Sequence, residues 1–109
     1  MIRIYRFVFL FLLLFISYAS VTPMEGGASV PYIDKLLHFS AFLILTLFMD
    51  LSIKKPLLFN KIAIIFLILY AFLIELVQYF LPYRSAEVFD FISDLLGVLA
   101  YLYLSLIHI

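Results

Sequence analysis

The chain has 109 residues, a formal net charge of zero and no cysteine, and 68% of its residues are hydrophobic. Soluble domains are about 45–50% apolar, and a domain of this size has too little interior to hide so many apolar side chains, so the composition excludes a soluble globular protein. The balanced charge gives no electrostatic attraction for nucleic acid, and the lack of cysteine excludes disulfides and thiolate chemistry. A spanning helix needs roughly 20 apolar residues, so the length suits four membrane helices.

Four apolar runs of spanning length follow one another along the chain. They cover about residues 4–21, 36–53, 62–81 and 88–107. Segments with turn-forming or charged residues separate the runs at 22–27, 54–56 and 81–84, and each contains a proline. The connections are short and no repeat divides the chain. We therefore expect one domain, residues 1–109, with an all-α fold: a four-transmembrane-helix bundle.

The first run permits a second interpretation. Arg3 and Arg6 precede its apolar core and Ser17-Tyr18-Ala19 follows it, which is the order of regions in a secretory signal peptide. The run is longer than a typical signal core, which favours a retained span. Cleavage would leave three spans with the same outer face.

The charged residues predict an orientation. Five of the seven basic residues lie near the amino terminus or near the connection between the second and third runs: Arg3, Arg6, Lys54, Lys55 and Lys61. Basic residues in short loops mark the cytoplasmic side, so both termini are predicted to be cytoplasmic. Six of the seven acidic residues belong to the outer half: Glu25, Asp34, Glu75, Glu87, Asp90 and Asp94. The exception, Asp50, is expected to form a helix-end pair with Lys54.

Polar side chains are predicted to gather near the outer ends of the last three spans. Asp34 and His38 are four residues apart on the second span, and Asp90, Asp94 and Gly97 follow at spacings of four and three on the fourth, so each set shares one helix face. Gly97 is expected to allow a close approach between helices. The candidate polar pocket consists of eight residues: Asp34, Lys35, His38, Glu75, Gln78, Arg84, Asp90 and Asp94.

The depth of this pocket favours function over structural support. Glu75 and Asp94 lie about 9 Å below the outer ends of their spans at 1.5 Å per residue, too deep for short side chains to reach water. Ionisable groups at that depth cost a few kcal/mol each and find partners inside the bundle. They can simply hold the helices together, but a bundle held by packing alone would not need so many of them.

Three kinds of chemistry are compatible with these residues. Arg84, Lys35 and His38 could bind an anionic headgroup or phosphate. Asp34, His38, Asp90 and Asp94 could instead hold a divalent cation in a membrane enzyme acting on a phosphate- or ester-linked lipid. No metal-binding spacing or nucleophile motif is present, so we expect no metal and no cofactor and assign no catalytic residue. A third hypothesis is an ion or proton pathway in an oligomer, with Glu75 and Asp94 as its relay.

Three sequence elements carry a family resemblance. Ser20-Val21-Thr22-Pro23 closes the first span, Asp34-Lys35-Leu36-Leu37-His38-Phe39 opens the second, and the segment from Glu75-Leu76-Val77-Gln78 through Pro82-Tyr83-Arg84-Ser85 continues to Asp90. In this combination, and over nearly the whole chain, the sequence resembles the VanZ-like family of small bacterial membrane proteins. The chain departs from the family pattern at Asp94, where asparagine is usual, and at Ala100, where glycine is usual.

The resemblance implies four transmembrane helices, a place in the bacterial cytoplasmic (inner) membrane and a link to teicoplanin susceptibility, but no established reaction. We therefore expect a multi-pass membrane protein, surrounded by membrane lipids, whose outward-facing pocket engages a lipid-linked anionic component of the cell envelope without catalysis. Arg84 and Lys35 would contact the anion, His38 would orient it or exchange a proton, and Asp90 with Glu75 would hold the basic groups in place. No nucleic-acid partner is expected, and the sequence does not indicate an oligomeric state.

Overall fold

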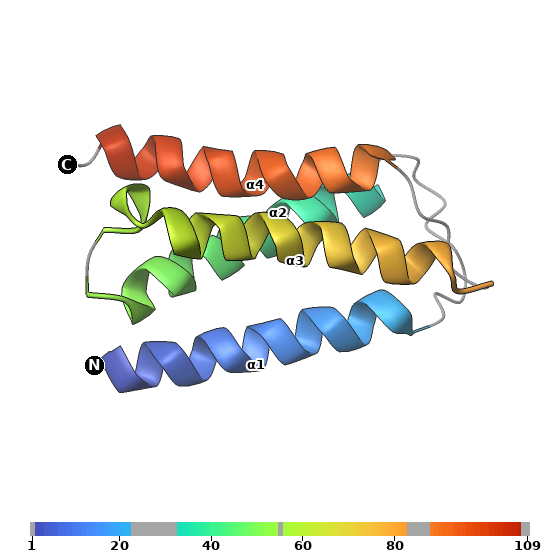
Figure 1. Cartoon of the computed structure of the whole chain (residues 1–109), viewed down its shortest axis with the longest axis horizontal. Coiled ribbons are helices and arrows are strands. Elements are labelled where there is room, and N and C mark those ends of the chain that lie inside the picture. Colours follow the sequence, from blue (N-terminus) through green and yellow to red (C-terminus); the bar gives the residue numbers. More distant parts are fainter. Residues whose placement is uncertain (1, 23–32, 55, 83–87, 108–109) are drawn as a thin grey trace.

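Four long helices make up the protein in a computed structural model that describes residues 2–22, 33–54, 56–82 and 88–107. They are α1 (Ile2–Val21), α2 (Ile33–Ser52), α3 (Lys61–Tyr79) and α4 (Val88–Ile107), and each is long and apolar enough to cross a membrane. The helices run alternately in opposite directions, so α1 begins and α4 ends at the same end of the bundle (Figure 1). The predicted all-α fold of four spanning helices is confirmed, while its cytoplasmic orientation stays a prediction.

The helix boundaries match the predicted runs to within three residues. The largest difference is at the start of α2. The helix begins at Ile33, three residues before the apolar run, and so includes the polar residues Asp34 and Lys35. The end of α3 differs in the opposite sense, because the helix stops at Tyr79, two residues before the predicted limit. The backbone N–H groups of Phe80 and Leu81 bond three residues back, to Val77 and Gln78, because Pro82 disfavours helical geometry in the residue before it.

A short 3₁₀ helix, η1 (Leu57–Phe59), was not predicted and lies between α2 and α3. Asn60 follows η1 and caps α3, since its side-chain oxygen accepts a hydrogen bond from the Ala63 N–H at 3.1 Å. Asparagine is one of the strongest N-cap residues, so its position directly before Lys61 is a signal that the sequence does contain.

The interior of the bundle is small and the surface is mostly apolar. Phe42 and Leu45 of α2 pack with Leu67 and Ala71 of α3 and with Val98 of α4 in the buried core. Large apolar side chains outside this core are exposed along all four helices, as expected when the surrounding solvent is lipid rather than water.

Among the described helices, α2 and α4 form the most extensive interface, and their backbones approach closely at Gly97. A Cβ atom at this position would lie 2.5 Å from the carbonyl oxygen of Phe39 and 3.0 Å from the backbone nitrogen of Leu43. Only a residue without a side chain lets the two backbones pack at this distance. The predicted close approach at Gly97 is confirmed.

Polar contacts attach α1 to the other helices. The Tyr70 hydroxyl lies 2.6 Å from the Ser17 hydroxyl and 2.9 Å from the Leu13 carbonyl oxygen. Near the start of α1, Arg6 Nε donates to the carbonyl oxygen of Ser52 at 2.9 Å. Removal of the first span would break these contacts, and its retention stays a prediction.

Candidate functional site

Three helices contribute the polar side chains of the candidate site. Lys35 and His38 lie on α2, Glu75 and Gln78 on α3, and Asp90 and Asp94 on α4. They lie towards the end of the bundle opposite to the chain's amino terminus, where α2 and α4 begin and α3 ends (Figure 1). Asp94 is fully buried, and Gln78 and Asp90 are only 1% and 2% exposed. We call the five ionisable residues among these six the polar cluster.

The centre of the polar cluster is His38, which lies between two carboxylates of α4. Its Nδ1 atom is 2.7 Å from Asp94 Oδ1, and its Nε2 atom is 3.8 Å from Asp90 Oδ2. Lys35 Nζ is 3.1 Å from the other oxygen of Asp90. Lys35 and His38 are about one turn apart on α2, as are Asp90 and Asp94 on α4, so the two pairs face each other across the helix interface.

Glu75 brings α3 into the same cluster. His38, Glu75 and Asp94 each offer an atom able to bind a metal, and these three atoms lie within 4.8 Å of one another. This set differs from the predicted cation ligands, because it contains Glu75 and not Asp90. The reason is depth: Glu75 and Asp94 both lie well inside the membrane span, whereas Asp90 lies one turn nearer the helix end and pairs with Lys35.

A small cavity adjoins the polar cluster between α1, α2 and α3. Its volume is about 260 Å³, and its walls are mainly apolar side chains with His38, Gln78 and Ser20 as the polar exceptions. Gln78 Nε2 donates to the backbone carbonyl of Ser20 at 3.0 Å. Within the described part of the chain, Gln78 Oε1 has no hydrogen-bond partner.

The contribution of α1 to this cavity was missed by the sequence analysis, which placed no residue of the first span in the pocket. Ser20 was noted only as part of a motif, yet it is the one buried residue of α1. A serine close to the carboxyl end of an otherwise apolar span is a weak signal, and nothing in the sequence pairs it with Gln78, 58 residues away.

Two predicted pocket residues are only partly covered by the structure. Arg84 lies outside the described residues, and Asp34 lies within α2 but its side chain is outside the description. Their expected parts, anion binding for Arg84 and cation binding for Asp34, therefore stay predictions.

Four membrane-length helices with paired ionisable side chains in their interior define a polytopic membrane protein with a buried polar site. Comparison with known sequences makes this class specific: the chain belongs to the VanZ/LLP1 family, whose sequence profile matches residues 3–108. The resemblance inferred from the sequence is thereby confirmed.

A relative of the chain is found in fission yeast. It is an uncharacterized protein of Schizosaccharomyces pombe, 32% identical over 106 residues, and the match covers 93% of this chain. The chain spans 62% of the length of that relative. No solved structure matches the chain.

Proposed function

We propose that this VanZ/LLP1 protein binds an amphiphilic component of the cell envelope, with the apolar chain of the ligand in the cavity and its anionic headgroup at the polar cluster. The observation that carries the proposal is the cavity itself. It is bounded by apolar side chains of three helices and meets the charged groups through His38 and Gln78. An apolar cleft with a few polar groups at one end is the usual form of a site for such a ligand.

Lys35 is the described basic residue that we assign to the headgroup. Its side chain is 24% exposed, and its Nζ atom lies 3.1 Å from Asp90 Oδ1. This contact holds the ammonium group at the edge of the cluster. The 2.7 Å contact with Asp94 fixes the ring of His38 beside the cavity. Arg84 is proposed as a second basic contact, in line with its place near the outer end of the third span.

The finer parts of this proposal concern the organism and the ligand. We propose a bacterial cytoplasmic membrane, with the cluster facing outward, and a link to teicoplanin susceptibility because glycopeptides act on that side. The fission-yeast relative supports a ligand that many membranes share, such as a lipid-linked phosphate, over a role restricted to antibiotic defence.

The test is binding of a polyprenyl phosphate to the purified full-length chain, followed by native mass spectrometry. Lys35→Met and Arg84→Ala should each weaken binding by roughly 10- to 100-fold, the effect of losing a hydrogen bond to a charged group. Asp90→Asn should weaken binding less than either, because it loosens the position of Lys35 without removing a contact to the ligand. Lys61→Met is the matched control, because Lys61 is exposed at the start of α3, at the opposite end of the bundle. Variants that insert normally and bind as tightly as the parent would refute the proposal. Teicoplanin susceptibility of bacteria producing the same variants tests the proposed physiological link.

One observation favours a second function. Ligands on opposite sides of a divalent cation lie about 4–5 Å apart, and the His38, Glu75 and Asp94 atoms fall within 4.8 Å. Such a cation would suit an enzyme acting on a phosphate- or ester-linked lipid. The test is metal analysis of the purified parent chain and of Glu75→Gln. No bound divalent ion in either protein, and no effect of chelation on turnover, would exclude the metal enzyme.

The proton pathway with Glu75 and Asp94 as its relay has a separate test. Proton flux in liposomes that is insensitive to Glu75→Gln would exclude this pathway.

A further inference from the structure

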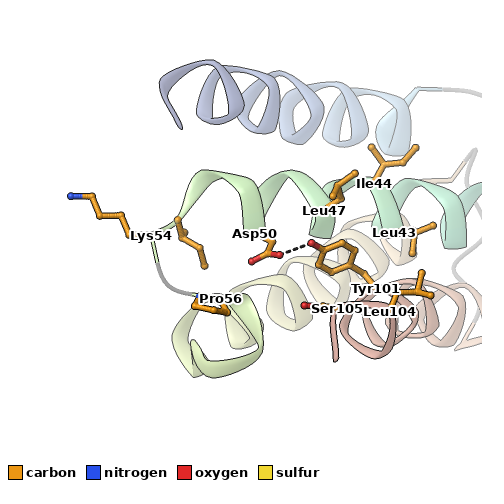
Figure 2. A pocket seen from close by; sticks show the side chains of 10 residues that line it. Leu43, Ile44, Leu47, Asp50, Lys54, Pro56, Tyr101, Leu104 and Ser105 are labelled. Atoms are coloured by element: carbon orange, nitrogen blue, oxygen red, sulfur yellow. Dashed lines mark hydrogen bonds between the residues drawn. The ribbon is translucent and has the colours of Figure 1, made fainter. Parts of the chain in front are cut away.

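A second and larger cavity lies at the other end of the bundle, where α1 begins and α4 ends. It is a groove of about 730 Å³ between α2 and α4, within the range of about 300–1,000 Å³ typical of ligand sites. Leu43 and Leu47 of α2 and Leu104 of α4 form much of its apolar wall (Figure 2). The groove is separate from the polar cluster and shares no lining residue with the smaller cavity.

The polar end of this groove is built around Asp50. Its Oδ2 atom accepts a hydrogen bond from the Tyr101 hydroxyl at 2.5 Å, and its Oδ1 atom accepts one from the Leu57 N–H at 2.9 Å. The predicted helix-end pair of Asp50 with Lys54 is therefore wrong, because the nearer donors come from α4 and η1. Both carboxylate oxygens are hydrogen-bonded within the protein, so Asp50 and Tyr101 form a fixed polar part of the groove wall, between Lys54 and the apolar lining.

Among the described residues Asp50 bonds elsewhere, so Lys54 presents its ammonium group at the mouth of the groove. Figure 2 shows its side chain extending past the end of α2, away from Asp50 and Tyr101. Lys54 lines the groove and is exposed. Arg3 and Lys61, which are also exposed, lie on elements that begin at the same end of the bundle, so the mouth lies in a basic region that attracts anionic headgroups.

The length of the groove matches one leaflet of a bilayer. Its lining on α2 and the following turn runs from Leu43 to Lys54, about 16 Å when the helical rise of 1.5 Å per residue is carried through the turn. That is about half of the roughly 30 Å hydrocarbon core of a bilayer. A lipid chain that enters the groove from the leaflet on the Lys54 side would reach Leu43 while its headgroup stays at the surface.

We propose that this groove binds one anionic phospholipid from the leaflet on the Lys54 side, with an acyl chain along Leu43, Leu47 and Leu104 and the phosphate headgroup on Lys54. The charge of the mouth selects the headgroup, and the apolar wall selects a chain of one-leaflet length. The site is distinct from the proposed outer site, since it lies at the opposite end of the bundle.

The headgroup part of the proposal is tested by competition between phosphatidylglycerol and phosphatidylcholine with identical acyl chains. The full-length chain is purified in detergent, mixed with equal amounts of both lipids and examined by native mass spectrometry. Phosphatidylglycerol should be retained preferentially, Lys54→Ala should reduce that preference roughly fivefold, and Lys54→Arg should preserve it. Lys61→Ala is the matched control, because Lys61 is exposed at the same end but does not line the groove. Equal losses in Lys54→Ala and Lys61→Ala would overturn the proposal in favour of general surface attraction.

The acyl-chain part is tested by filling the groove. Leu104→Trp should lower the binding of both lipids, whereas Leu106→Trp should not, because Leu106 is similarly exposed on α4 but lies outside the groove. Lipid binding that Leu104→Trp leaves unchanged would refute the groove as the site. The two proposals fail separately, because Lys54 and Leu104 do not line the smaller cavity and Lys35 does not line the groove.

Discussion

Enlarging Gly97 tests whether the packing of α4 against α2 sets the geometry of the polar cluster. Gly97 lies three residues after Asp94, which bonds to His38. A Cβ at Gly97 would lie 2.5 Å from the carbonyl oxygen of Phe39, whereas even close C–H···O contacts keep carbon and oxygen about 3.3 Å apart. The backbone of α2 cannot rotate out of the way as a side chain could, so α4 must move away by about 0.8 Å to relieve the contact.

The cost of this displacement follows from the contacts it weakens. A radial gap of 0.5–1 Å removes about a quarter to a half of each dispersion contact along the interface, and overpacking of this kind typically costs about 1–3 kcal/mol. The higher helix propensity of alanine returns up to about 1 kcal/mol. We therefore expect Gly97→Ala to lower the free energy of unfolding by about 1 kcal/mol and Gly97→Leu by about 3 kcal/mol or more.

The same displacement should change the polar cluster. The His38–Asp94 contact, 2.7 Å in the structure, would open towards about 3.5 Å, where a hydrogen bond is no longer formed. Unfolding of the purified protein by titration with sodium dodecyl sulfate, followed by circular dichroism, measures the stability change. The chemical shift of the His38 ring reports the loss of its bond to Asp94.

Leu99→Phe is the control for adding volume to α4 without crowding α2, because Leu99 is exposed on α4. It should leave both the stability and the His38 signal close to the parent values. If Gly97→Leu proves as stable as the parent, or if Leu99→Phe destabilises the protein equally, then close packing at Gly97 does not determine the site geometry and the reasoning is refuted.

Three further substitutions test the polar contacts between helices, with the same detergent titration as the measurement. Tyr70→Phe removes bonds to α1 and should cost about 1 kcal/mol, at roughly 0.6 kcal/mol for each hydrogen bond between membrane helices, whereas Tyr103→Phe on the exposed face should cost nothing measurable. Asp50→Ala should cost about 1–3 kcal/mol because it leaves the N–H of a buried Leu57 without its acceptor. Hydrogen exchange at the Leu57 amide should then accelerate, and unchanged exchange would contradict this prediction. Asp94→Asn retains the shape and an acceptor oxygen beside His38, so it should be milder than Asp94→Leu, and equal effects would show that the contact with His38 contributes little.

Much of the candidate site could be predicted because helical spacing assigns residues to faces before any neighbour is known. Asp34 and His38 had to share one face of α2, with Lys35 adjacent, and Asp90 and Asp94 one face of α4. The sequence also contains the depth of each group along its span. Spacing does not contain the pairing, however, so it could not decide that Asp90 pairs with Lys35 or that Glu75 joins His38 and Asp94.

Asp50 shows the same limit at the other end of the bundle. A lysine four residues along the chain made a local ion pair the natural expectation, because only local spacing is visible in a sequence. The partner is instead Tyr101, 51 residues away, and a donor in η1 that no apolar pattern predicted. The cavities are also invisible in the sequence, since each is the space left between helices that are distant along the chain.

The sequence by itself determined the four spans and the membrane environment, because the length and apolar content of each run are set by bilayer thickness and by the cost of an unsatisfied backbone in lipid. It also determined which polar residues share a face, because the helical repeat is local. Only the tertiary structure decided which faces meet, and it did so where Gly97 lets α4 approach the backbone of α2. That contact brings the carboxylates of α4 to His38, and its physical basis is the absence of a single side chain.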